Sequence, residues 1–513
     1  MKHPQVLPPR ARMVVEMGCG DGSFGAAFRR VQPACRYFGM DESRGNIREA
    51  ARRLDRAACE AAGAVDFSRY GLADVDCILC RAPYWNAAAL PALLAQFRQV
   101  LAPGGQVLLG VADDMTTEAV AALAPTLAQL GAATLEEIEG ARYVRISRTA
   151  PQRSLGIRVL ALDPVCESVR LCQPDGFLQT MPGITIAEEH LYDAQSGTPT
   201  LQREPLPTDD GVVVLERIGF PRAADALEEF AKMARDRQLI VHEYDDLPYW
   251  VGGDFYGVRL EQAFVAFRGV HAVQTSTPAL ADYFRAYNPY VLVFPNMLAE
   301  LPPARAFSRD TDTVTIFYGA LHREEDWQKI MPALNAAAAR YGARLRFKVT
   351  ADHAFFDALQ TEQKEYVGAA YNGGGFAPYE LYAAAMQESD IALLPLGDTP
   401  FNRMKSDLKF LEAAANGAVA LASPTVYART VRDGRTGFLY NDPQEFAQIL
   451  GALIEDPILR AETARLAYDY VRANRMLADH YEERAAAYRA LAARWDELEG
   501  ARQARIAQYF TGR

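Results

Sequence analysis

Three closely spaced glycines near the start of the chain are well suited to hold a polar or anionic ligand. Gly18, Gly20 and Gly22 follow Glu16 in the segment EMGCGDG, directly after a hydrophobic run and before the helical pattern SFGAAFRRV. Glycine permits a tight turn from a strand into a helix and lets a ligand approach the backbone amides closely. A turn that serves only the fold is the alternative that this motif leaves open.

An acidic residue follows the next hydrophobic run at the place where a bound nucleoside would present its ribose. Asp41 follows the run CRYFGM, about 20 residues after the glycines, and its carboxylate could accept hydrogen bonds from ribose hydroxyls. The spacing E-x-G-x-G-x-G, this acid and the later LAPGGQVLL resemble class I S-adenosylmethionine-dependent methyltransferases over residues 1–150. The resemblance implies S-adenosylmethionine as cofactor, with the three glycines along its methionine part, Asp41 at the ribose and Asp66 near the adenine. Dinucleotide binding is the rival that the glycine spacing and the PGG turn fit less well.

The segment RAPYW stands where members of that family often carry an acidic or histidine-containing segment. Tyr84 and Trp85 either shape an acceptor pocket or cover the edge of the sheet, and no residue is an unambiguous base for methyl transfer. A non-catalytic docking module is therefore the alternative for this domain. Just before it, Cys77 and Cys80 lie in the apolar run VDCILC, which predicts the interior of a strand rather than a redox or zinc site.

A second group of charged residues lies between Phe317 and Leu439. Arg323 follows the predicted strand TVTIFYGA and a turn at Gly319, and Lys405 lies at the start of the helix predicted for SDLKFLEAAANG. Lys409 comes one helical turn after Lys405. Cations beside a glycine turn and a helix start suit a diphosphate. Ser406 is the expected cap of that helix and Gly417 its expected end.

The stretch SDLKFLEAAANGAVALASPTVYARTVRDGRTGFL resembles the donor-binding half of retaining, two-Rossmann-domain (GT-B type) glycosyltransferases that use nucleotide sugars. The resemblance implies that Glu412 binds the ribose of the donor and that Arg323 and Lys405 neutralise its leaving diphosphate. The backbone around Phe376, in the loop NGGGFAPYEL, is expected at the nucleobase. The family has another glutamate eight residues before the ribose glutamate, where this chain has Met404, so that Asn402, Arg403 or Lys405 would take over part of its work.

An acidic pair marks the predicted acceptor half. In VHEYDDLPYW, His242 and Glu243 are followed by Asp245 and Asp246 at the expected end of a strand, where ligands collect in open α/β sheets. The pair could orient an acceptor hydroxyl or act as a base; a loop acid pair or a helix cap is the alternative. Two adjacent acids without a third ligand make a weak metal site, so we predict no metal.

The strands and helices that must position these residues can be predicted from the sequence. Hydrophobic runs alternate with helical patterns along the chain, which predicts parallel sheets covered by helices. The expected fold is α/β with three Rossmann-like domains and a long carboxy-terminal helix. The expected boundaries are 1–150 for the methyltransferase-like domain, 151–305 for the acceptor-side domain, 306–475 for the donor-binding domain and 476–513 for the helical segment. In the first domain we expect the third strand at AAGAVDF.

Composition excludes several classes of protein. The chain has 513 residues, 50% hydrophobic and 23% charged, which is typical of globular proteins with several cores. Its net charge of −11 argues against nucleic acid as a partner. No run of about 18 apolar residues appears, and the segment MKHPQVLPPRAR has no apolar core before a cleavage site, so we expect neither a membrane-spanning segment nor secretion. The seven cysteines are odd in number and lack a disulfide-framework spacing, which favours a cytoplasmic protein.

The function that we expect is transfer of a sugar from a nucleotide sugar to a glycan, a lipid-linked glycan or a protein. Peripheral contact with a membrane is compatible with the sequence. The resemblances place such a fusion in bacterial surface glycan synthesis. Oxidoreduction with two bound nucleotides is disfavoured because the expected donor-binding domain, residues 306–475, has no strand-linked GxGxxG.

Overall fold

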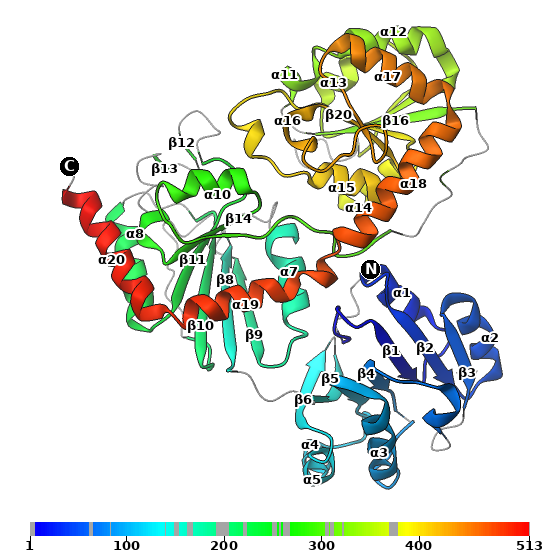
Figure 1. Cartoon of the computed structure of the whole chain (residues 1–513), viewed down its shortest axis with the longest axis vertical. Helices are drawn as coiled ribbons and strands as arrows, with labels where there is room; N and C mark the ends of the chain where they lie inside the picture. Colours follow the sequence, from blue (N-terminus) through cyan, green and yellow to red (C-terminus); the bar gives the residue numbers. More distant parts are fainter. Residues whose placement is uncertain are drawn as a thin grey trace. The chain divides into compact units, whose positions relative to one another are not determined.

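The computed structural model of the chain describes residues 6–60, 65–82, 84–138, 140–147, 153–161, 168–190, 205–218, 223–248, 254–255, 258–259, 267–302, 307, 312–320, 323–368 and 378–511. The chain divides into two compact units. One comprises Met1–Leu215, Ala231–Ile240 and Leu477–Glu499, and the other comprises Glu216–Phe230, Val241–Met476 and Gly500–Arg513. The predicted α/β class is confirmed, since helices alternate with parallel strands in three sheets (Figure 1).

The first sheet has the strand order β3-β2-β1-β4-β5-β7-β6. Strand β7 runs antiparallel to β5 and β6, and the other pairs are parallel. Its strands are β1 (Met13–Met17), β2 (Arg36–Asp41), β3 (Arg56–Cys59), β4 (Val75–Cys80), β5 (Leu101–Gly110), β6 (Ala132–Ile138) and β7 (Ala141–Ser147). The helices are α1 (Ser23–Val31), α2 (Arg44–Arg53), η1 (Phe67–Tyr70), α3 (Leu90–Val100), α4 (Thr117–Ala121) and α5 (Ala124–Leu127).

Strand β1 shows why helices cover both faces of this sheet. All five of its residues are buried. Val14 belongs to one buried cluster with Phe28 of α1, and Val15 belongs to another with Phe97 of α3. Successive side chains of a strand point to opposite faces, so a fully apolar strand needs a helix layer on each side. Figure 1 shows α1 and α2 on one side of the sheet and α3 on the other.

The expectation for the third strand is wrong. The structure has β3 at Arg56–Cys59, whereas the predicted segment AAGAVDF lies partly outside the described residues and ends at Phe67, where η1 begins. Strand β3 is an edge strand whose residues are half-buried or exposed, so it lacks a hydrophobic run. Val65 and Phe67 are buried beside it without being in a strand, and their apolar signal reflects core contacts.

The second sheet has the order β15-β14-β11-β10-β8-β9. Its strands are β8 (Leu155–Ala161), β9 (Ile184–His190), β10 (Asp210–Glu216), β11 (Leu239–Glu243), β14 (Ala272–Thr275) and β15 (Val291–Val293), and β12 (Asp254–Phe255) pairs separately with β13 (Val258–Arg259). The helices are η2 (Ser168–Cys172), α7 (Gln173–Leu178), α8 (Ala223–Arg235) and α10 (Pro278–Arg285). Strand β9 is a half-exposed edge strand, so it has no hydrophobic run by which the sequence could have predicted it.

The third sheet has the order β18-β17-β16-β19-β20-β21. Its strands are β16 (Val314–Gly319), β17 (Leu345–Thr350), β18 (Lys364–Tyr366), β19 (Ile391–Leu394), β20 (Val419–Ala422) and β21 (Phe438–Leu439). The helices are α11 (Glu324–Trp327), α12 (Met331–Tyr341), η3 (Gly342–Arg344), α13 (His353–Ala358), α14 (Tyr379–Gln387), η5 (Asn402–Met404), α15 (Leu408–Ala415), α16 (Pro424–Tyr427), α17 (Pro443–Glu455) and α18 (Pro457–Asn474).

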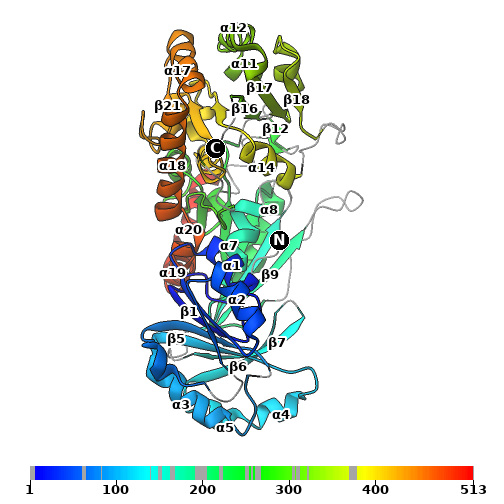
Figure 2. The same ribbon diagram turned by 90° about the vertical axis from the view of Figure 1, so that its right-hand side faces the viewer.

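Neighbouring residues of β16 again face different helix layers. Tyr318 belongs to a buried cluster with Leu334 of α12, and Phe317 belongs to one with Met386 of α14. Figure 2 shows α12 and α14 on opposite sides of β16 and β17. Strand β16 has β17 on one side and β19 on the other, so the strand order reverses at its carboxyl end.

The single long helix expected at the end of the chain is divided. The structure has η6 (Leu477–Asp479), α19 (Tyr481–Ala492) and α20 (Trp495–Thr511). Ala493 and Arg494 separate α19 from α20, although both are good helix formers, so local propensity does not mark the break. Helix α19 packs against α7, where the rings of Phe177 and Tyr481 lie 5.7 Å apart and Arg484 donates to the carbonyl of Arg170 at 2.9 Å.

Candidate functional site

The glycine-rich turn between β1 and α1 lies at the point where the strand order of the first sheet reverses. Strand β1 has β2 on one side and β4 on the other, and ligands bind at such points in open α/β sheets. Gly18, Gly20 and Gly22 have φ angles of +87°, +53° and +80°, which glycine adopts at little cost. A Cβ built on Gly20 would meet no atom within 4 Å. The turn is therefore open at Gly20.

Asp41 ends β2 directly beside this turn. Its buried carboxylate accepts hydrogen bonds from the Gly20 amide at 3.0 Å, the Ser43 amide at 2.9 Å and the Asn46 side chain at 3.0 Å. A carboxylate has about four acceptor positions, so about one remains for a ribose hydroxyl. The residues present fit an adenosyl group: an open glycine turn with an anchored carboxylate next to it.

A buried ion pair between Glu16 and Arg81 lies next to the glycine-rich turn. Glu16 is fully buried and accepts hydrogen bonds from the Tyr37 hydroxyl at 3.0 Å and from Arg81 Nε at 2.7 Å. Burial raises the pKa of Glu16, and the charge of Arg81 opposes that rise. Arg81 is the first residue of the RAPYW segment, so this segment helps to hold the turn.

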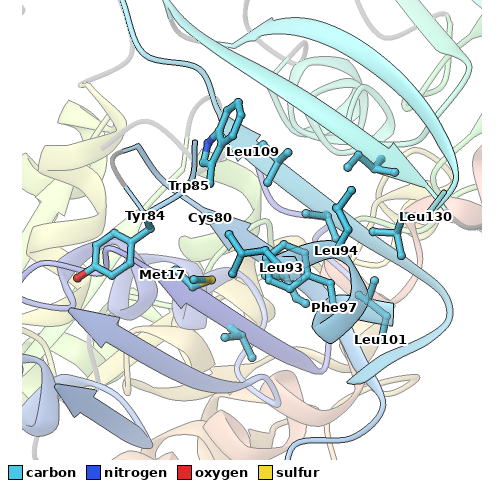
Figure 3. Packing of buried hydrophobic residues seen from close by; sticks show 14 of the residues in the cluster. Met17, Cys80, Tyr84, Trp85, Leu93, Leu94, Phe97, Leu101, Leu109 and Leu130 are labelled. Atoms are coloured by element: carbon cyan, nitrogen blue, oxygen red, sulfur yellow. The ribbon is translucent and has the colours of Figure 1, made fainter. Parts of the chain in front are cut away.

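Three further residues of the first domain have structural partners. Asp66, expected at the adenine, pairs with Arg69 at 3.5 Å, and about half of its side chain is exposed. Tyr84 and Trp85 are buried in the core with Met17 and Leu109 (Figure 3), and the Trp85 indole donates to the Gly110 carbonyl at 2.7 Å. Of the two interpretations of Tyr84 and Trp85, the structure favours the covering of the sheet.

Gly319 ends β16 at the reversal point of the third sheet. Its carbonyl accepts a hydrogen bond of 2.6 Å from Lys409 Nζ on α15. A Cβ at this position would lie 2.8 Å from the side chains of Phe317 and Thr350 and 2.9 Å from Tyr382. Close packing therefore requires glycine here, and that packing brings α14 and α15 to the end of β16.

Glu412 and Lys409 both lie beside Gly319 and Tyr382 at the end of β16. Glu412 is 8% exposed and accepts a hydrogen bond from the Tyr382 hydroxyl at 3.0 Å. Desolvation raises the pKa of Glu412 while the Lys409 charge lowers it. Desolvation likewise lowers the pKa of Lys409, with the charges of Arg323 and Lys405 acting in the same direction. Lys409 is thus close enough to Arg323, Lys405 and Glu412 for their charges to act on its pKa.

Arg323 is held by its own α11 and by η5. Its Nη1 donates to Asn402 Oδ1 at 2.7 Å and lies 3.2 Å from Asp326 Oδ2. The other oxygen of Asp326 accepts from the Gly397 amide at 2.7 Å and from Asn402 Nδ2 at 3.0 Å. Pairing with one of the acidic residues that follow it, Glu324, Glu325 or Asp326, was the alternative to a donor role for Arg323, and the structure shows the ion pair with Asp326.

Lys405 forms an ion pair with the acidic pair that was predicted for the acceptor half. Its Nζ lies 2.6 Å and 2.7 Å from the two oxygens of Asp246, which is 6% exposed. Burial raises the pKa of Asp246, and the charge of Lys405 opposes this. Asp245 accepts a hydrogen bond from Arg217 Nε at 3.0 Å. Arg217, a buried residue with a φ of +49°, was missed because nothing in its local sequence marks it.

The structure also shows the positions of the two expected ends of α15 and of His242. The residue at the N-cap position of α15 is Asp407 rather than Ser406, and its side chain makes no capping hydrogen bond. The Ser406 hydroxyl accepts a hydrogen bond from Asn296 at 2.9 Å. Gly417 follows the end of α15 with a φ of +74°, as expected. His242 is fully buried between the rings of Tyr244 and Phe267, and desolvation lowers its pKa to about 3.

Phe376, the residue expected at the nucleobase, lies outside the described residues. Within the part of the chain that the structure describes, no group of three or more His, Cys, Asp or Glu side chains could hold a metal ion. No helix among those residues is both long enough and apolar enough to cross a bilayer.

Two family models match separate parts of the chain. Residues 14–105 match a methyltransferase domain, and residues 329–490 match a glycosyl transferase-like family. A curated relative, described as an uncharacterized 37.1 kDa protein in transposon TN4556 of Streptomyces fradiae, is 29% identical over 102 residues. That match covers 19% of this chain and 30% of the length of the relative.

Several solved structures share a low similarity with the chain. A variant of S. aureus TarM, crystallised with UDP and α-GlcNAc-glycerol, is 10% identical with a TM-score of 0.40, over 54% of this chain and 55% of that one. HepE of Anabaena, in complex with UDP and glucose, is 15% identical with a TM-score of 0.42, over 64% and 98%. The antibiotic-resistance methyltransferase Kmr is 18% identical with a TM-score of 0.23, over 28% and 89%. By the two family models, the chain combines a methyltransferase domain at residues 14–105 with a glycosyl transferase-like domain at residues 329–490.

Proposed function

We propose that the chain transfers a sugar from a nucleotide-sugar donor to a glycan, lipid-linked glycan or protein acceptor. The supporting observation is the gathering of Arg323, Lys405, Lys409 and Glu412 around the carboxyl end of β16. Three cations suit the diphosphate of a donor, and a buried carboxylate suits its ribose hydroxyls. Cytoplasmic synthesis of bacterial surface glycans is the setting that we propose, in line with the thiol state of the described cysteines.

In this reaction the bond between the anomeric carbon and the diphosphate breaks, and its electron pair stays with the diphosphate. An acceptor hydroxyl forms the new bond to that carbon, and its proton passes to an oxygen of the leaving diphosphate, which has gained the electron pair. Negative charge on the leaving group therefore grows toward the transition state, so fixed cations bind that state better than the ground state. Lys405 is held by Asp246 through an ion pair, and a bound diphosphate would compete with Asp246 for it.

Steady-state kinetics with the donor varied test this assignment. Arg323→Ala and Lys405→Ala should each lower kcat by about 10²-fold or more. Glu412→Ala should mainly raise the KM for the donor, because a ribose contact stabilises ground and transition states alike. Arg340→Ala is the matched control, since Arg340 is an exposed arginine of the same region that pairs with Glu455. Near-normal activity of both the Arg323 and the Lys405 variant would refute the donor site.

For the amino-terminal domain we propose S-adenosylmethionine as ligand, held by the turn at Gly20 and by Asp41. When bound, this cofactor supplies an electrophilic methyl group. The burial of Tyr84 and Trp85 favours a second candidate role, in which the domain binds the cofactor without transferring its methyl group. Release of S-adenosylhomocysteine in the presence of candidate glycan acceptors would distinguish an active domain from such a docking module.

A further inference from the structure

Asp407 occupies the N-cap position of α15 but directs its carboxylate away from that helix. An aspartate at an N-cap ordinarily accepts a hydrogen bond from an amide of the first turn, and this side chain makes no such bond. Its two oxygens instead accept hydrogen bonds from Arg475 Nη1 at 2.6 Å and from Arg475 Nη2 at 2.9 Å, and Oδ2 also accepts one from the Thr430 hydroxyl at 2.6 Å. Asp407 thus forgoes a local capping bond for a partner 68 positions along the chain.

Arg475 connects α15 with two other segments of the chain. It is the C-cap residue of α18, which packs against α15 (Figure 1). Its Nη2 also donates to the Asn296 carbonyl at 2.9 Å, and its own carbonyl accepts a hydrogen bond from the Leu298 amide at 2.9 Å. The Asn296 side chain in turn donates to the Ser406 hydroxyl at 2.9 Å. Because Ser406 and Asp407 are neighbours in sequence, these contacts form a closed ring through Asn296, Ser406, Asp407 and Arg475.

The ring of contacts lies directly beside Lys405, the residue before Ser406. The side chains of Arg475 and Asp407 are only 12% and 13% exposed, so water competes little for their hydrogen bonds. A bidentate pair between an arginine and a carboxylate fixes both the distance and the orientation of its partners. The ring therefore fixes the backbone of the short segment that carries Lys405 into α15.

We propose that Arg475 is a positioning residue of the donor site, which acts through Asp407 to hold Lys405 where it meets the leaving diphosphate. This inference rests on the proposed glycosyl transfer and adds to it the residue that orients one of its cations. A cation stabilises the charge of a leaving group best when it is already in place, because no reorganisation is then needed during the reaction. A displacement of about 1 Å costs up to about 10²-fold in rate, so a residue that only holds the segment contributes to turnover.

Calorimetric titrations of the full chain with UDP and GDP test the proposal, because these nucleotides carry the charge of the leaving group. Arg475→Ala should weaken the tighter-binding of the two by about tenfold, the scale of losing one charge-assisted hydrogen bond. In a Lys405→Ala background the same substitution should have no further effect, because the cation that Arg475 positions is gone. In a Glu412→Ala background it should keep its full effect, since Glu412 is assigned to the ribose. Arg472→Ala, at an exposed arginine of the same helix that pairs with Asp469, is the matched control and should change neither affinity.

The outcomes separate this inference from the function on which it rests. Asp407→Asn breaks the same ion pair from its other side with little change in size, so it should reproduce the loss, and it replaces Arg475→Ala in the titrations if that variant does not fold. If Arg475→Ala weakens binding equally with and without the Lys405 side chain, the residue acts through the fold, and the proposal is wrong while the donor site stands. Normal affinity of both Arg475→Ala and Asp407→Asn would also overturn it. If the unmutated chain binds neither UDP nor GDP, both the positioning role and the proposed function are overturned.

Discussion

Two charged residues three positions apart on α15, Lys409 and Glu412, make hydrogen bonds inside the protein rather than pointing into the solvent. Lys409 donates to the carbonyl of Gly319, and Glu412 accepts from Tyr382. Residues three apart on a helix lie on one face, so a single helix brings both a cation and an anion to the end of β16. The raised pKa of Glu412 makes this arrangement sensitive to pH.

As the pH is lowered, nucleotide affinity should begin to fall at a higher pH than it would if Glu412 had the pKa of an ordinary glutamate. The pKa of Glu412 is raised in the folded chain, so its carboxylate takes up a proton above its ordinary value and then loses its charge as an acceptor for ribose hydroxyls. Titrations with UDP or GDP between about pH 8 and pH 5 would show this. Glu412→Gln cannot titrate and should lack this step, while titration of the phosphate is common to both proteins. Identical pH profiles for the two proteins would contradict the role of Glu412.

At the amino-terminal turn, Gly20→Val should abolish binding of S-adenosylmethionine. The open space over Gly20 is where a ligand would lie, and a valine side chain would fill it. Gly140→Val is the matched control, because Gly140 also has a positive φ, of +80°, and open space over its Cα, but lies in the turn between β6 and β7. Backbone strain is therefore present in both variants, and only the first should lose the cofactor. Equal cofactor affinity in both would place the ligand elsewhere.

Among the elements, β4 shows why the Cys-x-x-Cys spacing of this chain fits the interior of a strand better than a redox site. Cys77 and Cys80 lie within the strand and are completely buried, three positions apart and thus on opposite faces of the sheet. Burial raises the pKa of each thiol to about 12. Their thiolate forms are therefore nearly absent at neutral pH.

Alkylation of the native chain with iodoacetamide at about pH 8 should spare Cys77 and Cys80 and modify the exposed Cys59. The thiolate is the reacting species, and both its absence and its burial protect the two strand cysteines. Peptide mass spectrometry after a time course would give the order of modification. A sample unfolded in guanidinium chloride should react at all three sites at similar rates, and rapid native modification of Cys80 would contradict the interior position.

For the whole molecule, the division into two compact units predicts that the two ligands bind independently. The glycine turn at Gly20 belongs to one unit, and Arg323 with Lys405 belongs to the other. Gly20→Val should leave UDP or GDP affinity unchanged, and Arg323→Ala should leave S-adenosylmethionine affinity unchanged. Titrating the nucleotide with and without saturating S-adenosylmethionine gives the coupling directly, since coupling between two binding sites is reciprocal. A change of about fivefold or more would show that the units communicate.

Much of the fold was predictable because the signals for it are local. Hydrophobic runs identified β1, β2, β4, β11 and β16, since a strand buried on both faces must be apolar throughout. The glycines at Gly18, Gly20 and Gly22 predicted a turn because their positive φ angles need glycine. The edge strands β3 and β9 were missed or misplaced, because an edge strand is only half-buried and has no such run.

The sequence by itself determined the two family resemblances, the α/β class, the central strands and the turns that begin each proposed site. Only the tertiary structure decided which partners the charged residues have. It paired Lys405 with Asp246, 159 positions away, it put Asp326 and Asn402 around Arg323, and it placed Trp85 in the core. The physical reason is that strand and turn preferences act between near neighbours along the chain, whereas ion pairs, desolvation and packing depend on distances in space that only the folded chain sets.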